Sequence, residues 1–249
     1  FSLGSAELNP TEFRKLISLR KYICSQFRPS SAKALYDLFE PVSVLDPCSG
    51  WGDRLAGAFA STTVLNYTGI DPNSRLIQGY GDQITTYHSF SPMKAKMISQ
   101  GAEDVELTDS YDLVFTSPPY FDVERYNSES TQSWKKYKKL QDWKEKFLFV
   151  MISKAWHSLK DGGILILNIS DVYSHHQRQE FCDDMNDYIS TLDDSHYCGA
   201  IGYRMSKRIN SGYIGESKIF GEPIWIWSKN KSVDLLSLFP PMPVQLNLF

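Results

Sequence analysis

The sequence is poor in cysteine and carries no large excess of charge of either sign. Its four cysteines are widely spaced along 249 residues, and none forms a CxxC pair. Such spacing in a long chain indicates neither a disulfide framework nor a zinc site, so we expect no metal and a reducing compartment. With 26 Lys and Arg against 29 Asp and Glu, the net charge is −3. The chain is therefore no generic polycation, and a polyanionic partner would need a local basic patch.

Long hydrophobic runs are also missing. No apolar stretch approaches the roughly 18 residues that a membrane span needs, and no signal peptide is visible. We therefore expect a soluble intracellular protein, in the cytoplasm or nucleus, with no membrane partner. The chain is 42% hydrophobic with ordinary glycine and proline counts, so it is neither disordered nor collagenous and can bury a sizeable core.

Short apolar runs alternate with longer helical or polar segments, which is the pattern of a parallel sheet in an α/β fold. The expected strands are Val42–Asp46, Tyr67–Asp71, Lys96–Ser99, Tyr111–Ser117, Gly163–Ser170, Tyr197–Met205 and Pro223–Ser228. The expected helices begin at Asn9 and after Ser30, and continue with Arg54–Ser61, Ser74–Ser89, Asp142–Leu159 and Gln177–Leu192. No repeat or linker divides the chain. We expect a helical segment over residues 1–40, one domain over 41–230 and a tail over 231–249.

A glycine turn follows the first expected strand, in the sequence Asp46-Pro47-Cys48-Ser49-Gly50-Trp51-Gly52. Its two glycines allow a tight turn and close approach of a ligand to bare backbone. Asp71 lies about twenty residues further on, at the end of the next strand, where nucleotide-binding folds place a carboxylate that accepts from ribose hydroxyls. The spacing favours adenosine recognition, although a two-glycine turn alone also fits an ordinary connection from strand to helix. No GxxxxGK[ST] occurs, which excludes a P-loop.

This turn and the later acid resemble the S-adenosylmethionine site of class I methyltransferases. The resemblance implies a single domain with a mostly parallel seven-stranded sheet and helices on both faces, and S-adenosylmethionine as cofactor. The implied cofactor-binding residues are Asp46, Pro47, Gly50, Gly52 and Asp71. The segment Gln100–Asp104 is similar to the family's Gly-x-Ala-acid turn, where Glu103 or Asp104 would meet the adenine amino group; both are equally typical of solvated loop acids.

The fourth expected strand runs into Thr116-Ser117-Pro118-Pro119-Tyr120. Two prolines at the carboxyl end of a strand cannot donate hydrogen bonds, so the backbone is stiff and its carbonyls are free to accept from an N–H group. A tyrosine directly afterwards offers a flat face for a planar base, an interaction worth about 1–3 kcal/mol in nucleic-acid complexes. A Pro-Pro pair can also simply end a strand.

The sequence Ser117-Pro118-Pro119-Tyr120 resembles the catalytic motif of amino methyltransferases, which act on exocyclic nitrogens. The serine form looks like cytosine-N4 DNA methyltransferases, whereas Asp-Pro-Pro is commoner in adenine-N6 enzymes and Asn-Pro-Pro in enzymes acting on adenine or protein glutamine. The resemblance covers residues 27–229. It implies direct displacement, with the Ser117 side chain and the Pro118 carbonyl accepting the amino hydrogens, Tyr120 stacking on the base and Pro119 fixing the loop. A covalent route is disfavoured. Cytosine-C5 enzymes, which use it, need a Pro-Cys nucleophile on the loop after the fourth strand, whereas the one Pro-Cys pair here, Pro47-Cys48, lies in the glycine turn.

Two basic stretches could hold a nucleic acid, with DNA favoured over RNA. Residues 125–146 contain seven basic residues against three acidic ones, with aromatic residues interleaved, and residues 203–218 form a second patch. The candidate substrate-binding residues are Phe121, Arg125, Lys135, Lys136, Arg204, Lys207 and Arg208. A solvated amphipathic helix would give the first stretch the same composition.

Other functions stay open at this stage. Many Ser-Pro-Pro-Tyr enzymes have the reverse motif order, so adenine N6 in DNA or RNA is the second candidate. The chain leaves little room for a separate target-recognition domain, which suggests low sequence specificity, a specificity partner or a homo-oligomer. A protein-glutamine or small-molecule N-methyltransferase would not need the basic stretches. A catalytically inactive subunit that only binds nucleic acid would not need the intact motifs.

Overall fold

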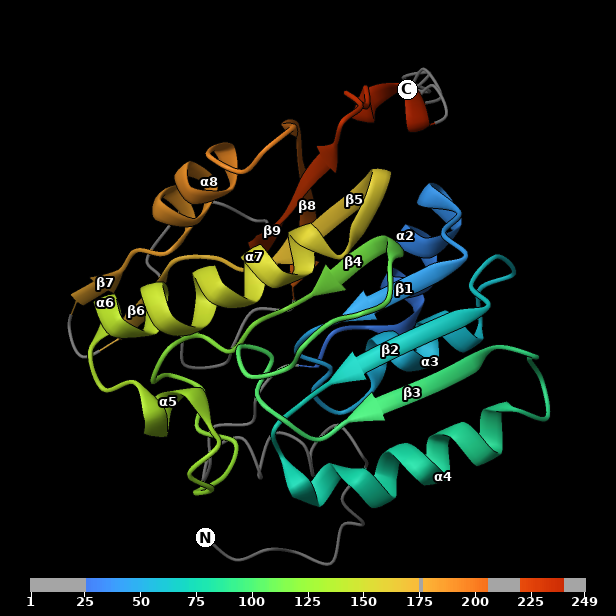
Figure 1. Cartoon of the computed structure of the whole chain (residues 1–249), viewed down its shortest axis with the longest axis horizontal. Helices are drawn as coiled ribbons and strands as arrows, with labels where there is room; N and C mark the ends of the chain where they lie inside the picture. Colours follow the sequence, from blue (N-terminus) through green and yellow to red (C-terminus); the bar gives the residue numbers. More distant parts are fainter. Residues whose placement is uncertain (1–25, 175–176, 206–219, 240–249) are drawn as a thin grey trace, which may run out of the picture.

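The computed structural model of the protein describes residues 26–174, 177–205 and 220–239. Its main feature is a seven-stranded sheet in the order β3-β2-β1-β4-β5-β9-β8 (Figure 1). The strands are β1 Ser43–Asp46, β2 Asn66–Ile70, β3 Lys94–Ile98, β4 Tyr111–Thr116, β5 Leu159–Asn168, β8 Ser195–Met205 and β9 Phe220–Lys229. All pairings from β3 to β5 are parallel, and β9 runs antiparallel to both of its neighbours. The expectation of a mostly parallel seven-stranded sheet is confirmed.

Helices cover both faces of this sheet (Figure 1). One face carries α2 Pro29–Phe39, α3 Asp53–Phe59 and α4 Ile77–Tyr87, and the other carries α6 Leu140–Trp143, α7 Phe149–His157 and α8 Cys182–Ser190. Successive strand residues point to opposite faces of the sheet. Leu113 and Phe115 therefore pack in the core on the side of α2, α3 and α4, while Val114 packs in the core on the side of α7 and α8. Because both faces are buried, β4 and β5 contain continuous apolar runs at residues 113–115 and 164–167, which is why the sequence reveals them.

Short elements complete the structure. They are the 3₁₀ turns η1 Ser74–Leu76 and η3 Leu235–Leu238, the four-residue helix α5 Ser133–Lys136, the π-turn Lys144–Leu148 between α6 and α7, and a hairpin of β6 Val172–Ser174 and β7 Gln177–Gln179. None of the helices in the described ranges has the length and hydrophobicity of a membrane span.

The expected helix from Gln177 to Leu192 is wrong at its start. Residues 177–179 form β7, and α8 begins only at Cys182. The reason lies in Asp171, whose Oδ1 accepts hydrogen bonds from the backbone N–H groups of Phe181 and Cys182 and so satisfies donors at the first turn of α8. The apolar stripe of this helix is nevertheless core as expected, since Phe181, Met185 and Ile189 are fully buried.

The helix expected after Ser30 also needs correction. It begins at Pro29, and its buried residues are Ala32, Leu35 and Tyr36, whereas Ala34 is exposed. The expected helix at Asn9 and the last ten residues of the expected tail lie outside the described residues.

The carboxyl ends of β1, β2 and β4 meet at one edge of the sheet. Asp46 pairs with Gly69 and Leu45 with Val114, so the loops that follow these strands start side by side. The strand order reverses between β1 and β4, and in open α/β sheets the crevice at such a switch point is where ligands bind.

Candidate active site

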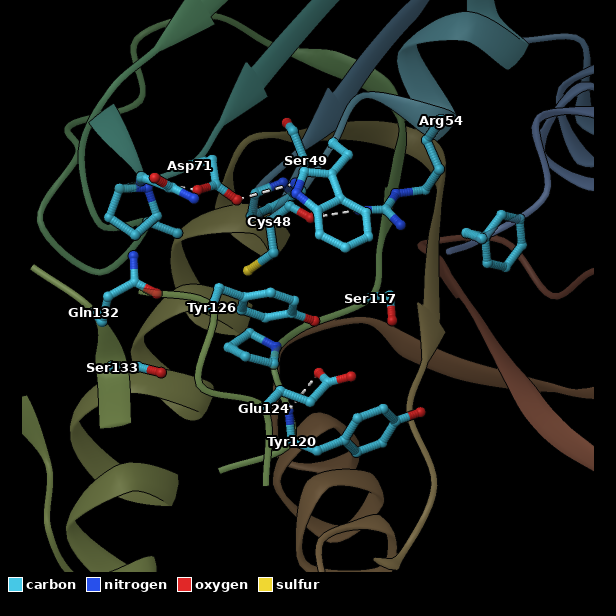
Figure 2. A pocket seen from close by; sticks show the side chains of 18 of the residues that line it. Cys48, Ser49, Arg54, Asp71, Ser117, Tyr120, Glu124, Tyr126, Gln132 and Ser133 are labelled. Carbon is cyan, nitrogen blue, oxygen red and sulfur yellow. Dashed lines mark hydrogen bonds between the residues drawn. The ribbon is translucent and has the colours of Figure 1, made fainter. Parts of the chain in front are cut away.

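A pocket opens at this edge of the sheet, between the glycine turn after β1 and the loop after β4 (Figure 2). Its walls bring together several residues expected from the sequence. They are Pro47, Gly50, Asp71, Glu103, Ser117, Pro119 and Tyr120. The glycine turn, the acid after β2 and the Ser-Pro-Pro-Tyr motif therefore share one cavity, although they are far apart in sequence.

The glycine turn needs its glycines for backbone geometry. Gly50 has φ of 55° and Gly52 has φ of 86°, in the left-handed region that favours glycine. A Cβ atom on Gly52 would also lie 2.5 Å from Oε1 of Gln83. Gly50 lines the pocket, whereas Gly52 lies behind it and precedes the first turn of α3. At Gly50 the turn thus presents bare backbone to a ligand.

Asp71 is anchored at the pocket wall. Its two carboxylate oxygens accept hydrogen bonds from the backbone N–H groups of Gly50, at 3.0 Å, and of Asn73, at 2.9 Å. Burial raises the pKa of this carboxyl to about 6, even though both hydrogen bonds favour the charged form. The carboxylate is therefore fixed in place and poorly hydrated, which suits an acceptor of hydroxyl groups from a ligand.

Asp46 does not reach the pocket, contrary to its expected role as a cofactor-binding residue. Its fully buried carboxylate accepts from Arg54, with 2.8 Å between Nε and Oδ2, and from the Tyr67 hydroxyl at 2.7 Å. The second Arg54 nitrogen bonds Oδ1 of Asp46 and the carbonyl of Cys48. Asp46 thus holds the glycine turn through Arg54, which itself lines the pocket, so the structure supports a positioning role for Asp46.

Glu103 lines the pocket, whereas Asp104 lies outside it and is exposed. The Glu103 carboxylate is buried, and its Oε2 has no hydrogen-bond partner among the described residues. Its other oxygen lies 2.6 Å from the ammonium nitrogen of Lys136, which also lies 2.7 Å from Oδ2 of Asp104. Lys136, expected at the substrate, is thus paired with two acids on the cofactor side.

Residues 126–137, which we call the strap, follow the catalytic motif. They contact the residues after Asp71 at one end and Glu103 at the other. Asn127 donates to the Asn73 side chain at 2.7 Å, and the Glu129 carboxylate accepts from the hydroxyl of Ser74 at 2.6 Å. At the other end of the strap, Lys136 and the Tyr137 hydroxyl bind Glu103. The strap therefore bonds Glu103 directly and reaches Asp71 only through the residues that follow it, Asn73 and Ser74.

Tyr120 is held rigidly in the catalytic motif. Its ring is only 7% exposed, and its hydroxyl donates to the Glu222 carboxylate at 3.3 Å. Its backbone N–H donates to Oε2 of Glu124 at 3.2 Å. Burial, then the nearby charges of Glu222 and Glu124, raise the pKa of the phenol well above its usual value. Tyr120 therefore stays a neutral phenol in a fixed orientation, and with Ser117 and Pro119 it borders the pocket, whereas Pro118 does not.

Phe121 does not line the pocket either, although we expected it to bind substrate. It is buried, with its ring centroid 6.0 Å from that of Trp143. Its φ of 40° turns the chain sharply after the motif. Phe121 is thus a core residue that shapes the loop.

The Cys48 thiol is unsuited to nucleophilic attack. Burial raises its pKa well above the usual value, and the charges of Asp71 and Asp46 raise it further. Because the thiolate is the nucleophilic form, Cys48 is inert near neutral pH. This supports direct displacement over a covalent route.

Exposed cations gather at the rim of the pocket. Arg125, Lys135 and Lys138 surround the ring of Trp134, with their charged groups 5.1, 4.9 and 4.9 Å from a ring centroid. Trp134 itself lines the pocket. Of the other candidates, Arg204 is exposed on β8, and Lys207 and Arg208 lie outside the described residues.

Sequence reasoning missed several pocket residues. Glu124, Asn168, Glu222 and the exposed aromatic pair Trp51 and Tyr126 all line the cavity. Asn168 could have been found, because it ends β5, the parallel neighbour of β4. Glu124 lies four residues after Tyr120, but only the turn at Phe121 brings it back to the motif. Glu222 lies 102 residues after Tyr120 in the sequence, and no motif around it predicts that it lines the pocket.

Comparison with known proteins identifies the fold and the family. No curated protein sequence matches the chain significantly. A family model described as DNA methylase matches residues 111–234, about half of the chain.

Three of the solved structures that are similar to this chain illustrate the fold. A putative class I S-adenosylmethionine-dependent methyltransferase from Listeria monocytogenes has a TM-score of 0.54 and 20% identity, with 96% of this chain and 74% of that chain covered. TehB from Haemophilus influenzae has a TM-score of 0.54 and 11% identity, covering 88% and 66%. TrmN from Thermus thermophilus has a TM-score of 0.52 and 14% identity, covering 85% and 51%. At such identities these likenesses show the fold.

The fold, the DNA methylase match over β4 to β9 and the Ser-Pro-Pro-Tyr motif at the start of the matched region lead to one assignment. The chain belongs to the class I S-adenosylmethionine-dependent N-methyltransferases.

Proposed function

We propose that this enzyme methylates the exocyclic amino group of a nucleobase, with cytosine N4 in DNA as its preferred target. The observation that carries the proposal is the shared cavity, in which Ser117 and Tyr120 face the same space as Asp71 and the glycine turn (Figure 2). A methyl donor bound along the turn and a base at the motif would thus meet inside one pocket.

The pocket residues fit S-adenosylmethionine. The Asp71 carboxylate can accept from ribose hydroxyls, and the unpartnered Oε2 of buried Glu103 can accept from an amino group such as that of adenine. Gly50 leaves bare backbone beside Asp71, where a side chain would be strained by the positive φ. When bound, the cofactor supplies an electrophilic methyl group on a positively charged sulfur.

The motif supplies orientation rather than covalent chemistry. The lone pair of an exocyclic amine is delocalised into the ring, so the amine must be held in line with the methyl group by acceptors for its hydrogens. We assign this role to the Ser117 hydroxyl, which borders the pocket; the Pro118 carbonyl, expected to share it, belongs to a residue that does not border the pocket. Pro119 stiffens the loop, and the fixed ring of Tyr120 provides a surface against which the base packs.

The preference for cytosine rests on Ser117. The serine form of the motif is the one that resembles cytosine-N4 enzymes. The DNA methylase match over residues 111–234 includes this motif and supports a base in DNA, but it does not distinguish cytosine from adenine. Adenine N6 in DNA or RNA is the alternative outcome of the experiment below. Specificity for a sequence would be low or come from a partner, which can be another protein or a second copy of the chain.

The rim cations support a polyanionic substrate. Arg125, Lys135 and Lys138 are exposed beside the pocket-lining Trp134, where they can meet the phosphates that flank a flipped-out or single-stranded base. Lys136, Lys144 and Lys146 pair with acids of the chain itself, and Arg125 also lies 3.5 Å from the Asp122 carboxylate. Fewer basic side chains are therefore available to phosphates than the seven basic residues of this stretch suggest.

The test is to incubate the protein with methyl-labelled S-adenosylmethionine and, separately, single-stranded DNA, duplex DNA and RNA, then digest each polymer to nucleosides. We expect label in N4-methylcytosine from DNA. Label in N6-methyladenine would redirect the assignment to adenine, and label in no polymer would refute a nucleic-acid substrate. Ser117→Ala should lower transfer at least tenfold with cofactor affinity unchanged.

A further inference from the structure

We propose that Glu124 is a catalytic residue of this enzyme, and that its carboxylate takes the proton that the exocyclic nitrogen loses during methylation. The inference rests on the proposed function, because it assigns a role toward the amine substrate. It deepens that function by naming the proton acceptor, a role that the Ser-Pro-Pro-Tyr motif does not fill.

Glu124 sits directly against the motif. It is 6% exposed, lines the same pocket as Ser117 and Pro119, and is fixed by the Tyr120 N–H, 3.2 Å from its Oε2. Figure 2 shows its carboxylate turned into the space that Ser117 and Tyr120 border. A buried acid that lines a reaction pocket and accepts a hydrogen bond from the backbone of the motif is a candidate for a chemical role.

The reaction releases a proton that such a group can take up. The nitrogen lone pair forms the new N–C bond while the electron pair of the broken S–C bond stays on sulfur. The nitrogen then carries a positive charge, and it becomes neutral when the electrons of one N–H bond stay on nitrogen and the proton leaves. Neither the Ser117 hydroxyl nor a backbone carbonyl is basic enough to keep that proton. The Glu124 carboxylate takes it and passes it to water when the product leaves.

Glu222 is the other carboxylate of this part of the pocket. It approaches from β9 and accepts from the far end of the tyrosine, 3.3 Å from the Tyr120 hydroxyl. Glu124 instead accepts from the backbone N–H of Tyr120, within the motif that contains Ser117, whose hydroxyl would hold the amine. We therefore assign the proton to Glu124 and a positioning role for the Tyr120 ring to Glu222.

The decisive variant is Glu124→Gln. Its side-chain oxygen can still accept from the Tyr120 N–H, so the loop is retained, but an amide cannot accept a proton at neutral pH. General-base catalysis contributes about 10²–10⁴-fold, so we expect the single-turnover rate of methyl transfer to fall at least about 100-fold. Cofactor affinity, measured by calorimetry, and the melting temperature should match those of the wild type. Glu106→Gln, at a glutamate whose side chain is 90% exposed, is the matched control.

Each result decides the matter. A large rate loss in Glu124→Gln, with cofactor affinity retained and Glu106→Gln fully active, supports the proposal. Activity of Glu124→Gln within threefold of wild type overturns it, as does a loss seen in Glu222→Gln but not in Glu124→Gln. A Glu124→Gln loss explained by weaker cofactor binding also overturns it. If the wild type itself methylates no nucleic acid, the proposed function fails and this role fails with it, which distinguishes the two failures.

Discussion

At the scale of single residues, Asp71 has the clearest consequence for solution behaviour. Burial raises its pKa to about 6, so below that pH the folded protein holds it mainly as a neutral acid. A ribose hydroxyl donates more strongly to the charged form. Cofactor affinity should therefore be near its maximum above about pH 7, be about halved near pH 6 and be about tenfold lower at pH 5.

Calorimetric titration with S-adenosylmethionine between pH 5 and 8 measures this dependence. The Asp71→Asn variant should bind weakly at every pH and lose the dependence. An affinity of the wild-type protein that is flat from pH 5 to 8 would show that Asp71 is not the ribose acceptor.

Arg54 should dominate the stability of the glycine turn. It is 5% exposed and forms a two-bond ion pair with the fully buried Asp46. Removing one partner of such a pair leaves an uncompensated buried charge and costs about 3–5 kcal/mol. We expect Arg54→Leu to lower the free energy of unfolding by this amount in urea denaturation. Arg125→Leu, at an exposed arginine, should change it by less than about 1 kcal/mol; similar losses in both variants would contradict this account.

At the scale of elements, the strap joins the catalytic motif to the cofactor side. Lys136 pairs strongly with two acids: burial works against the charged lysine, but the hydrogen bonds that it donates to Asp104 and Glu103 outweigh burial and raise its pKa. Lys136→Ala should therefore loosen the strap.

We expect hydrogen exchange of residues 126–137 to become at least about threefold faster in Lys136→Ala, since the pair is partly solvated and its loss is modest. Lys135→Ala, one residue earlier and exposed, should leave exchange unchanged. Equal hydrogen-exchange rates in Lys136→Ala and the wild type would contradict this account, because the other contacts of the strap would then hold it in place without Lys136.

The elements also show what the sequence reveals and what it hides. The central strands are buried on both faces, so their apolar runs mark them, and β4 is found within one residue of its observed end. The hairpin strand Gln177–Gln179 is polar and short, so no periodicity separates it from the helix that follows. Asp71 could be placed at the pocket from its spacing alone. It follows β2, which is parallel to its neighbours β1 and β3, so the carboxyl ends of the three strands meet at one edge of the sheet. Glu124 and Glu222 could not, because the positive φ of Phe121 and the return of β9 bring them to Tyr120.

At the scale of the whole molecule, the net charge of −3 conceals a local cationic rim. Among the described residues, Lys135, Lys138 and Lys139 are exposed and form no ion pair with an acid. Each phosphate contact contributes about −0.9 to the slope of log affinity against log salt for duplex DNA, and about −0.7 for a single strand.

The triple variant Lys135→Ala, Lys138→Ala, Lys139→Ala should therefore bind DNA more weakly, with a slope shallower by about 2. Fluorescence anisotropy over a salt series measures both quantities. A matched triple of alanines at Lys33, Lys94 and Lys231, which are not pocket residues, should leave the slope unchanged. An unchanged slope in the rim variant would place the polyanion elsewhere.

The central claim is that the methyl group goes to an exocyclic nitrogen of a base. The most direct measurement uses ¹³C-methyl S-adenosylmethionine, DNA uniformly labelled with ¹⁵N, and NMR of the digested nucleosides. We predict a one-bond ¹³C–¹⁵N coupling to the amino nitrogen of cytosine. A transferred methyl without such a coupling to any exocyclic nitrogen, as on a ring carbon or a hydroxyl, would contradict the account.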